Sequence, residues 1–203
     1  VDNQGHKFEY YDSYLRYLEK FPVTQSLFDA VDSNNIHEVR RWLAKGANPN
    51  IWDNSVTTWS LIHLAIYHRN PQMIEVLASG GADINATRYD GIPPLSKAVY
   101  SNNYDCFKML LELGADTELS KIAVEYSGTP EMKRLFKKYT NLANSLNDAV
   151  ESDNINKVRK LLAQGANPNI WHKSINNWSM IHLAIYRHNP EMIDVLASGG
   201  ADI

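Results

Sequence analysis

The sequence contains a long internal duplication. Residues 26–84 align without a gap to residues 145–203, and 41 of the 59 aligned positions are identical. A shorter period lies inside this one, because Gly-Ala pairs start at residues 46, 81, 114, 165 and 200, at intervals of 35, 33, 51 and 35 residues. Such a period indicates a row of small stacked units, each too small to fold alone.

Each unit contains two short helical patterns joined by a turn. In the second unit "SLIHLAIYHRN" (residues 60–70) is followed by "PQMIEVLASGGAD" (residues 71–83). Pro71 suits the first turn of a helix, where its missing N–H is no loss, and Gly80-Gly81 suits a helix end, where a left-handed residue is needed. The helical spacing of apolar residues predicts a buried face made of Leu61, Ile62, Leu64, Ala65, Ile66, Met73, Ile74, Val76 and Leu77.

The motifs of these units match a known pattern. The third unit reads "GIPPLSKAVYSNNYDCFKMLLELGAD" from Gly91, and the second and sixth contain "WSLIHLAIY" and "WSMIHLAIY" before "GGADI". These segments resemble the ankyrin-repeat family. The resemblance implies an all-α solenoid of helix-turn-helix units with short β-hairpin fingers between them. We expect the units at residues 24–50, 57–86, 91–117, 118–140, 144–169 and 176–203, after an N-terminal capping helix region in residues 1–23.

The fourth unit, residues 118–140, is degenerate. It keeps a helix start at "TPEM" but lacks Gly-Ala-Asp, and its second helix, expected at about Pro130–Tyr139, runs into the next unit with no room for a finger. We therefore predict that the concave surface is interrupted here, which leaves two binding segments. The second copy stops at Ile203, where the first copy continues with "NATRYDG", so we expect the natural protein to continue.

Composition and motifs argue against several functions. The net charge of −3 gives no general attraction to nucleic acid or anionic membrane, and no apolar run approaches the roughly 20 residues that span a bilayer. A single cysteine favours a reducing, cytoplasmic compartment. The seven histidines show no zinc-ligand spacing, and Cys106 stands at an apolar helical position, where a buried small hydrophobe is expected. We expect no enzyme activity, no metal and no cofactor.

His63 and His182 occupy the Leu-His position of the repeat pattern. One interpretation gives them a catalytic or metal-binding role. The favoured interpretation is structural, in which the imidazole hydrogen-bonds to nearby backbone and ties a finger to a helix.

Two tryptophans frame the loop that differs most between the copies. Trp52 and Trp59 recur as Trp171 and Trp178, whereas the residues between them change. A tryptophan pair across a finger can stack and stiffen it, and exposed indoles are frequent binding anchors. Both interpretations stay open, and they are compatible, because a stiff finger loses less entropy on binding.

In ankyrin proteins the partner usually meets the fingertips and the exposed positions of the first helices. The resemblance therefore implies a set of partner-binding residues here: Asn54, Val56, Trp59, Tyr67, His68, Tyr89, Asp90, Ile92, Tyr100, Ser101, Lys173, Trp178, Tyr186 and Arg187. It also implies a modification, because Asn85 in "GADINA" is similar to asparagines that a 2-oxoglutarate-dependent hydroxylase modifies in animal cells.

The main functional hypothesis is a non-catalytic, monomeric, cytoplasmic scaffold that binds another protein through its fingertips and concave helix face. The alternative is the substrate-recognition module of a larger secreted effector enzyme, from an intracellular bacterium and acting in the host cytoplasm, whose catalytic part lies outside this chain. A third hypothesis is a regulatory subunit that covers the active site of an enzyme.

Overall fold

The computed structural model describes residues 26–51, 59–87, 90–170 and 178–201. The chain divides into two compact units, residues 1–94 and residues 95–203. Every regular element in the described ranges is a helix, which confirms the all-α class. The capping region expected at residues 1–23 and the tips of the fingers lie outside the described residues.

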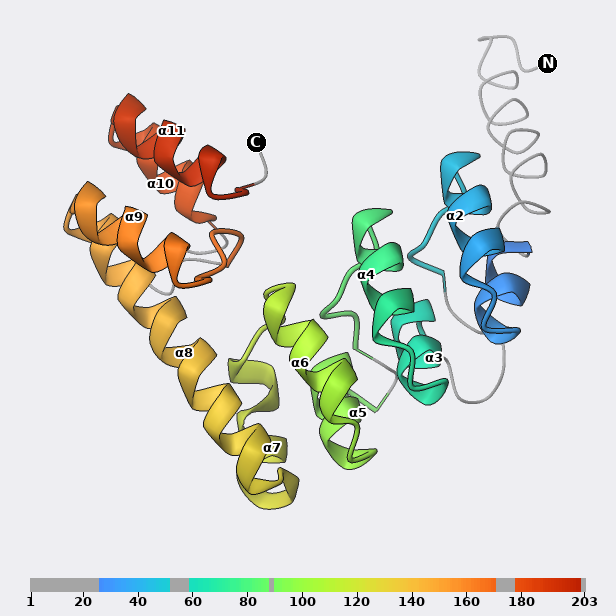
Figure 1. Cartoon of the computed structure of the whole chain (residues 1–203). Helices are drawn as coiled ribbons and strands as arrows, with labels where there is room; N and C mark the ends of the chain where they lie inside the picture. The colour runs from blue at the N-terminus through green and yellow to red at the C-terminus, as the bar shows by residue number, and fades with distance from the viewer. Residues whose placement is uncertain (1–25, 52–58, 88–89, 171–177, 202–203) are drawn as a thin grey trace, which may run out of the picture. The chain divides into compact units, whose positions relative to one another are not determined.

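The described part of the first unit consists of two helical hairpins. Its helices are residues 26–32, α2 (Ile36–Ala44), α3 (Leu61–Tyr67) and α4 (Pro71–Ser79). Helix α4 packs against both α3 and α2, so the second helices of the two hairpins are neighbours (Figure 1). The nine apolar residues that the helical period predicted to face inward in residues 61–77 are all at most 5% exposed.

The second unit begins with the hairpin of α5 (Pro94–Tyr100) and α6 (Tyr104–Glu112). The rest of it consists of the short 3-10 turn η1 (Glu118–Ser120), α7 (Lys121–Ser127), α8 (Pro130–Glu151), α9 (Ile155–Ala163), α10 (Met180–Tyr186) and α11 (Pro190–Ser198). Helices α6 and α7 pack against α8, and α8 also packs against α9 and α10.

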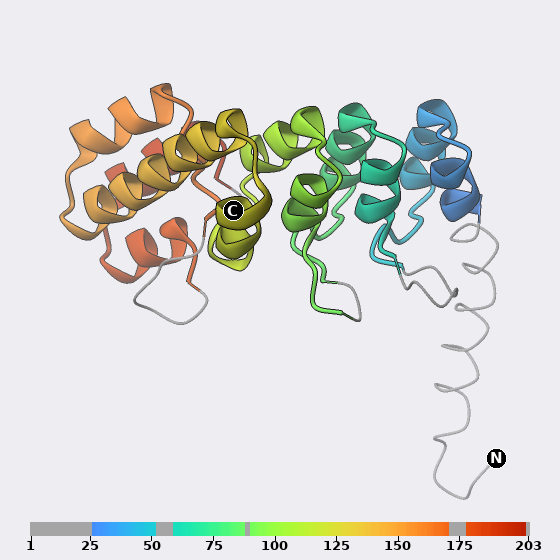
Figure 2. The same cartoon turned by 90° about the horizontal axis from the view of Figure 1, so that it is seen from below.

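Helix α8 differs from the helix expected at Pro130–Tyr139. It has 22 residues, about 33 Å at 1.5 Å per residue, and it continues through the expected boundary between the fourth and fifth units (Figure 2). Thr129 starts it by accepting a hydrogen bond from the Met132 N–H at 3.2 Å, and no glycine or proline follows Pro130 before its end at Glu151. One helix therefore serves as the second helix of one hairpin and the first helix of the next.

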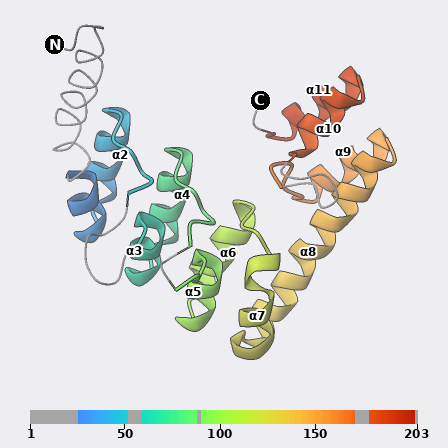
Figure 3. The ribbon, with the colours of Figure 1, turned by 180° about the vertical axis from the view of Figure 1, so that it is seen from behind.

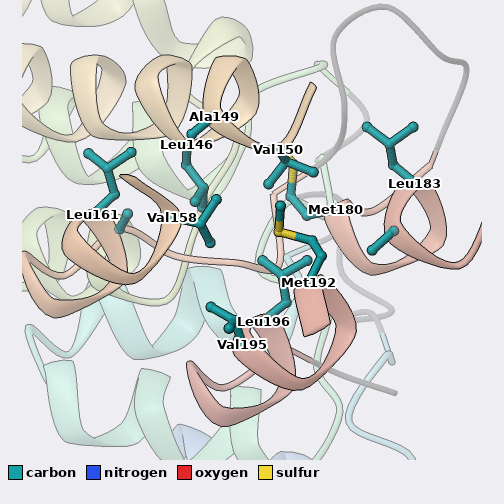
Figure 4. Close-up of a cluster of buried hydrophobic side chains, with 12 residues drawn as sticks. Leu146, Ala149, Val150, Val158, Leu161, Met180, Leu183, Met192, Val195 and Leu196 are labelled. Atoms are coloured by element: carbon teal, nitrogen blue, oxygen red, sulfur yellow. The ribbon is translucent and has the colours of Figure 1, made fainter. Parts of the chain in front are cut away.

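The core at the C-terminal end of α8 joins side chains from four helices, α8, α9, α10 and α11. Figure 4 shows Val150, Met180 and Met192 pointing toward one another from α8, α10 and α11. Figure 3 shows α9, α10 and α11 gathered around this end of α8. The cluster includes Leu146, Ala149, Val158 and Leu196, each fully or almost fully buried.

Asparagine starts the second helix of each regular hairpin. Each of these side chains accepts a hydrogen bond from the backbone N–H three residues later, and they are Asn35, Asn70, Asn103, Asn154 and Asn189. The residue before each of them has a positive φ, between 46° and 56°. The repeated turn thus has a local chemical cause, since a side-chain cap satisfies one of the free N–H groups at a helix start.

The Asn-Pro-Asn motif, at residues 48–50 and 167–169, hydrogen-bonds the loop after one hairpin to the loop after the next. In the first unit the Asn50 side chain donates to the Gly81 carbonyl at 2.9 Å and accepts from the Asp83 N–H at 2.7 Å. In the second unit Asn169 donates to the Gly200 carbonyl at 3.0 Å in the same way. The motif therefore has a structural role, because its last side chain bonds to the backbone of the next loop.

Candidate functional site

An aromatic pair stands at the first helix of the second and sixth repeats. Trp59 precedes the N-cap Ser60 and lies edge-on to Tyr67 at the end of α3, with 5.3 Å between ring centroids and 64° between planes. Trp178 and Tyr186 repeat this arrangement at 5.2 Å and 70°. Edge-to-face contacts of this kind add stability beyond the area they bury. Hereafter we call these the Trp–Tyr pairs.

The tyrosine of each pair is largely in solvent. Tyr67 is 64% exposed and Tyr186 is 66% exposed, whereas the residue before Tyr67, Ile66, is 1% exposed. Trp59 and Trp178 are half-buried. Each pair therefore presents one open aromatic ring, which a half-buried indole holds in place.

The residue after each tyrosine reaches back to the preceding hairpin. The His68 ring contacts Tyr67 edge-on, and its Nε2 lies 4.0 Å from Asp32 Oδ1. In the second copy Arg187 Nη1 donates to the Val150 carbonyl at 3.2 Å and to the Glu151 carbonyl at the end of α8. A cation is favourable there, because the C-terminal carbonyls of a helix carry partial negative charge. Arg187 thus connects its pair to the scaffold by hydrogen bonds, whereas His68 only approaches Asp32, because 4.0 Å is too long for a hydrogen bond.

His63 fixes the loop that follows it. Its side chain is fully buried, its Nδ1 lies 2.7 Å from Ser60 Oγ, and its Nε2 lies 3.2 Å from the Ile92 carbonyl oxygen. Since a carbonyl can only accept, Nε2 carries the hydrogen, and in the neutral ring Nδ1 accepts from the Ser60 hydroxyl. This confirms the structural interpretation of His63. His182 keeps the bond to Ser179, at 2.6 Å, but its side chain is exposed.

The third repeat carries a tyrosine at the same place. Tyr100 ends α5 and is 54% exposed. Ser101 follows it, and its hydroxyl donates to the Lys97 carbonyl at 2.8 Å.

Two other predicted contact residues, Asp90 and Ile92, bond to each other in the first unit. Asp90 Oδ1 accepts from the Ile92 N–H at 3.1 Å, which shapes the base of the finger.

The other predicted contact residues are only partly described. Asn54, Val56, Tyr89 and Lys173 lie outside the described residues, as do Trp52 and Trp171. Asn85 is half-buried, and its backbone N–H donates to Asp83 Oδ1 at 2.8 Å. The sequence did not reveal the contact of each second tryptophan with a tyrosine eight residues later, although both rings recur in both copies.

An exposed apolar stripe on η1 and α7 also escaped the sequence analysis. Leu119, Ile122 and Tyr126 are 52%, 71% and 81% exposed. Their spacing of three and four residues places them on one side of the helix. Helix α8 packs against α7, but it does not cover these three side chains.

The described residues carry little chemistry of the catalytic kind. No group of three or more His, Cys, Asp or Glu side chains among them could hold a metal ion, and Cys106 is fully buried, as expected. A backbone hydrogen bond at the start of α8 lowers the pKa of the exposed Glu131 carboxyl. Burial, and then the Glu112 carboxylate and Tyr104, raise the pKa of Tyr139. Both groups lie on α8, away from the Trp–Tyr pairs in the chain.

Nowhere in the described ranges does a helix combine the length and the apolar character that crossing a membrane requires.

Comparison with known proteins identifies the repeats. The family model described as "Ankyrin repeats (3 copies)" matches residues 27–121, and that described as "Ankyrin repeats (many copies)" matches residues 146–197. The stretch between these two matches, residues 122–145, contains all of α7 except its first residue and the first part of α8.

Several curated proteins are similar over much of the chain. The B-cell lymphoma 3 protein homolog of Mus musculus is 30% identical over 81% of this chain and 33% of its own length. Ankyrin repeat and SOCS box protein 6 of Homo sapiens is 32% identical over 61% of this chain and 27% of its own length. SH3 and multiple ankyrin repeat domains protein 2 of Homo sapiens is 29% identical over 44% of this chain and 5% of its own length. The chain thus spans a third or less of these relatives. With its family-model matches, its stacked helical hairpins and its Gly-Ala-Asp loops, the chain belongs to the ankyrin-repeat family.

Proposed function

We propose that this chain is a non-catalytic scaffold that binds another protein, with the two Trp–Tyr pairs as its anchors. Ankyrin repeats are in general protein-interaction modules. The observation that carries the proposal is the exposure of Tyr67 and Tyr186, 64% and 66%, at the same helix end in both copies. A large ring at this exposure is unfavourable in water and becomes favourable when a partner covers it.

The fixed position of the ring adds to its value as an anchor. An edge contact with a half-buried tryptophan restricts each tyrosine before binding. A side chain that is already ordered loses less conformational entropy when a partner arrives. The two pairs therefore offer partner contact at little ordering cost, in each unit separately.

The two copies present different chemistry beside the same ring. His68 follows Tyr67 in the first copy, and Arg187 follows Tyr186 in the second. The remaining predicted contacts are Asp90 and Ile92 in the first unit and Tyr100 and Ser101 in the second. We infer that each pair meets a different part of the partner.

Affinity capture with quantitative mass spectrometry tests this proposal. The bait is the whole chain, compared with the double variant Tyr67→Ala/Tyr186→Ala. The matched control is Tyr126→Ala, which removes a tyrosine that is 81% exposed but lies outside the pairs. We expect the double variant to lose its partner, with an affinity lowered by about tenfold or more, while the control retains it. Equal capture by all three baits would contradict the proposal.

A second variant tests whether the tryptophans have a structural role or contact the partner. Trp59→Ala/Trp178→Ala is expected to weaken partner binding with the helical circular dichroism retained. If this variant unfolds, the tryptophans belong to the frame, and the tyrosines alone are the anchors.

We also propose that the chain acts as a monomer in the cytoplasm. Light scattering on the purified chain measures its mass, and a dimer mass would contradict the first part. A tagged chain followed by microscopy locates it, and an extracellular location would contradict the second. The length of the natural reading frame distinguishes the scaffold from the recognition module of a larger effector enzyme.

A further inference from the structure

The second unit contains a cavity of about 470 Å³ beside helix α8. The loop after α6, the middle of α8 and the loop after α9 form its walls. This volume falls in the range of about 300–1,000 Å³ that small-ligand sites occupy. Much of the wall is apolar, through Leu111, Ala115, Leu142, Ala143, Ala166 and Ile170.

Two amide oxygens at this wall have no hydrogen-bond partner among the described residues. They belong to Asn144 and Asn147, which both line the cavity. Asn147 is only 6% exposed, and its Nδ2 reaches Glu151 Oε1 at 3.5 Å. A buried acceptor without a partner destabilises a protein, so such a group requires an explanation.

Packing does not require an amide at this position. Asn147 aligns with Phe28 in the first copy, in a stretch where the residues on both sides are identical. The duplicated helix therefore accepts an apolar side chain here. The second copy instead places an unpaired oxygen beside the cavity.

The charged residues that line the cavity are both acidic. Asp116 and Glu118 line it, and among the described lining residues there is no Lys, Arg or His. Carboxylates and amide oxygens accept hydrogen bonds, so this wall favours a ligand that donates them and carries positive charge.

We propose that the cavity beside α8 receives a lysine or arginine side chain from a partner protein. The aliphatic stem of such a side chain suits the apolar wall, and its charged head suits the carboxylates and the two unpaired amide oxygens. The choice of a protein side chain over a free amine rests on the proposed partner-binding function. The chemistry of the cavity itself does not depend on the Trp–Tyr pairs.

Nuclear magnetic resonance on the whole chain, labelled with ¹⁵N, tests the proposal. The probe is Nα-acetyl-lysine methylamide, and the matched probe is Nα-acetyl-norleucine methylamide, which has an apolar side chain without the charge. We expect the lysine probe to shift the side-chain amide signals of Asn144 and Asn147 and the backbone signal of Gly114. The norleucine probe should bind at least about tenfold more weakly than the lysine probe. No shift with the lysine probe, or equal binding of the two probes, would overturn the proposal.

Variants on one helix separate a binding role from a packing role. Asn147→Leu is expected to abolish the lysine-probe shifts and to raise the melting temperature, since it removes an unpaired buried amide. Asn141→Leu makes the same change at an exposed position of α8 and should alter neither. If Asn147→Leu does not fold, Ala143→Phe fills the cavity instead and should abolish binding. Unchanged binding in a folded cavity variant would overturn the proposal.

Two further arms identify the source of the ligand and separate this inference from the proposed function. Pentane-1,5-diamine represents a free amine, and tighter binding of it than of the lysine probe would overturn the partner-protein source. The variant Tyr67→Ala/Tyr186→Ala should keep the lysine-probe shifts unchanged. Loss of partner capture by that variant therefore tests the Trp–Tyr pairs alone.

Discussion

The duplicated histidines give a matched test of how the repeats are held together. His63→Leu and His182→Leu make the same change at aligned positions, but the first side chain is fully buried and the second is exposed. His63→Leu removes hydrogen bonds to Ser60 Oγ and to the Ile92 carbonyl, at 2.7 and 3.2 Å. His182→Leu removes the bond to Ser179, where water can replace it.

The magnitude follows from these contacts. Each buried group left without a partner costs about 1–3 kcal/mol, and part of this is offset because leucine is more favourably buried than imidazole. We expect His63→Leu to lower the free energy of unfolding by about 2–4 kcal/mol, whereas a surface change such as His182→Leu lies within about 0.5 kcal/mol.

Urea unfolding followed by circular dichroism measures both values, and hydrogen exchange with mass spectrometry locates the effect. In His63→Leu the loss of protection should concentrate in α3 and in the loop that contains Ile92. Equal loss of stability in the two variants, or a larger loss in His182→Leu, would refute the reasoning that this histidine acts by tying a loop to a helix.

Three more outcomes are expected. Ile66→Ala should lower the free energy of unfolding by about 2–5 kcal/mol, because Ile66 is 1% exposed, and Ile185→Ala by about 1 kcal/mol or less, because Ile185 is 52% exposed and no cavity forms; urea titration measures both. The pKa of Tyr139 is raised in the folded chain, so the unfolded chain releases this proton first, and the stabilising contribution is present below about pH 10 and lost as the pH rises through the folded pKa. The urea midpoint of the parent chain should therefore fall relative to that of Tyr139→Phe as the pH rises past about 10, and parallel curves would contradict this. Incubation with an asparaginyl hydroxylase and 2-oxoglutarate should add one oxygen atom to Asn85, which peptide mass spectrometry detects, and an unmodified Asn85 would exclude it as a substrate.

Most of the fold could be predicted because the signals are local. The apolar period of residues 61–77 identified the buried face, and Pro71 and Gly81 marked a helix start and end. The family motifs then supplied the way in which hairpins stack. None of these steps requires knowledge of distant contacts.

The repeat pattern does not predict the length of helix α8. A boundary was expected near Tyr139 because the repeat pattern places one there. Local sequence argued otherwise, since residues 131–151 contain no glycine or proline that would end a helix. At this place the local sequence, and not the repeat pattern, determines where the helix ends.

The candidate site depended on contacts that sequence spacing does not reveal. Arg187 bonds to carbonyls 36 and 37 residues earlier, at the end of α8. The cavity exists because three segments far apart in sequence meet beside that helix. The unpaired oxygen of Asn147 was equally hidden, although the change from Phe28 between otherwise matching segments was a visible signal.

The continuous helix α8 makes this part of the array intolerant of insertions and deletions. A loop between two repeats can absorb an extra residue with little effect. One residue inserted near the middle of α8 would instead rotate everything after it by about 100°, so that Met132 and Leu146 could no longer face their present neighbours together. Natural relatives that keep this helix should therefore vary in length at their fingers and conserve the number of residues between these two positions.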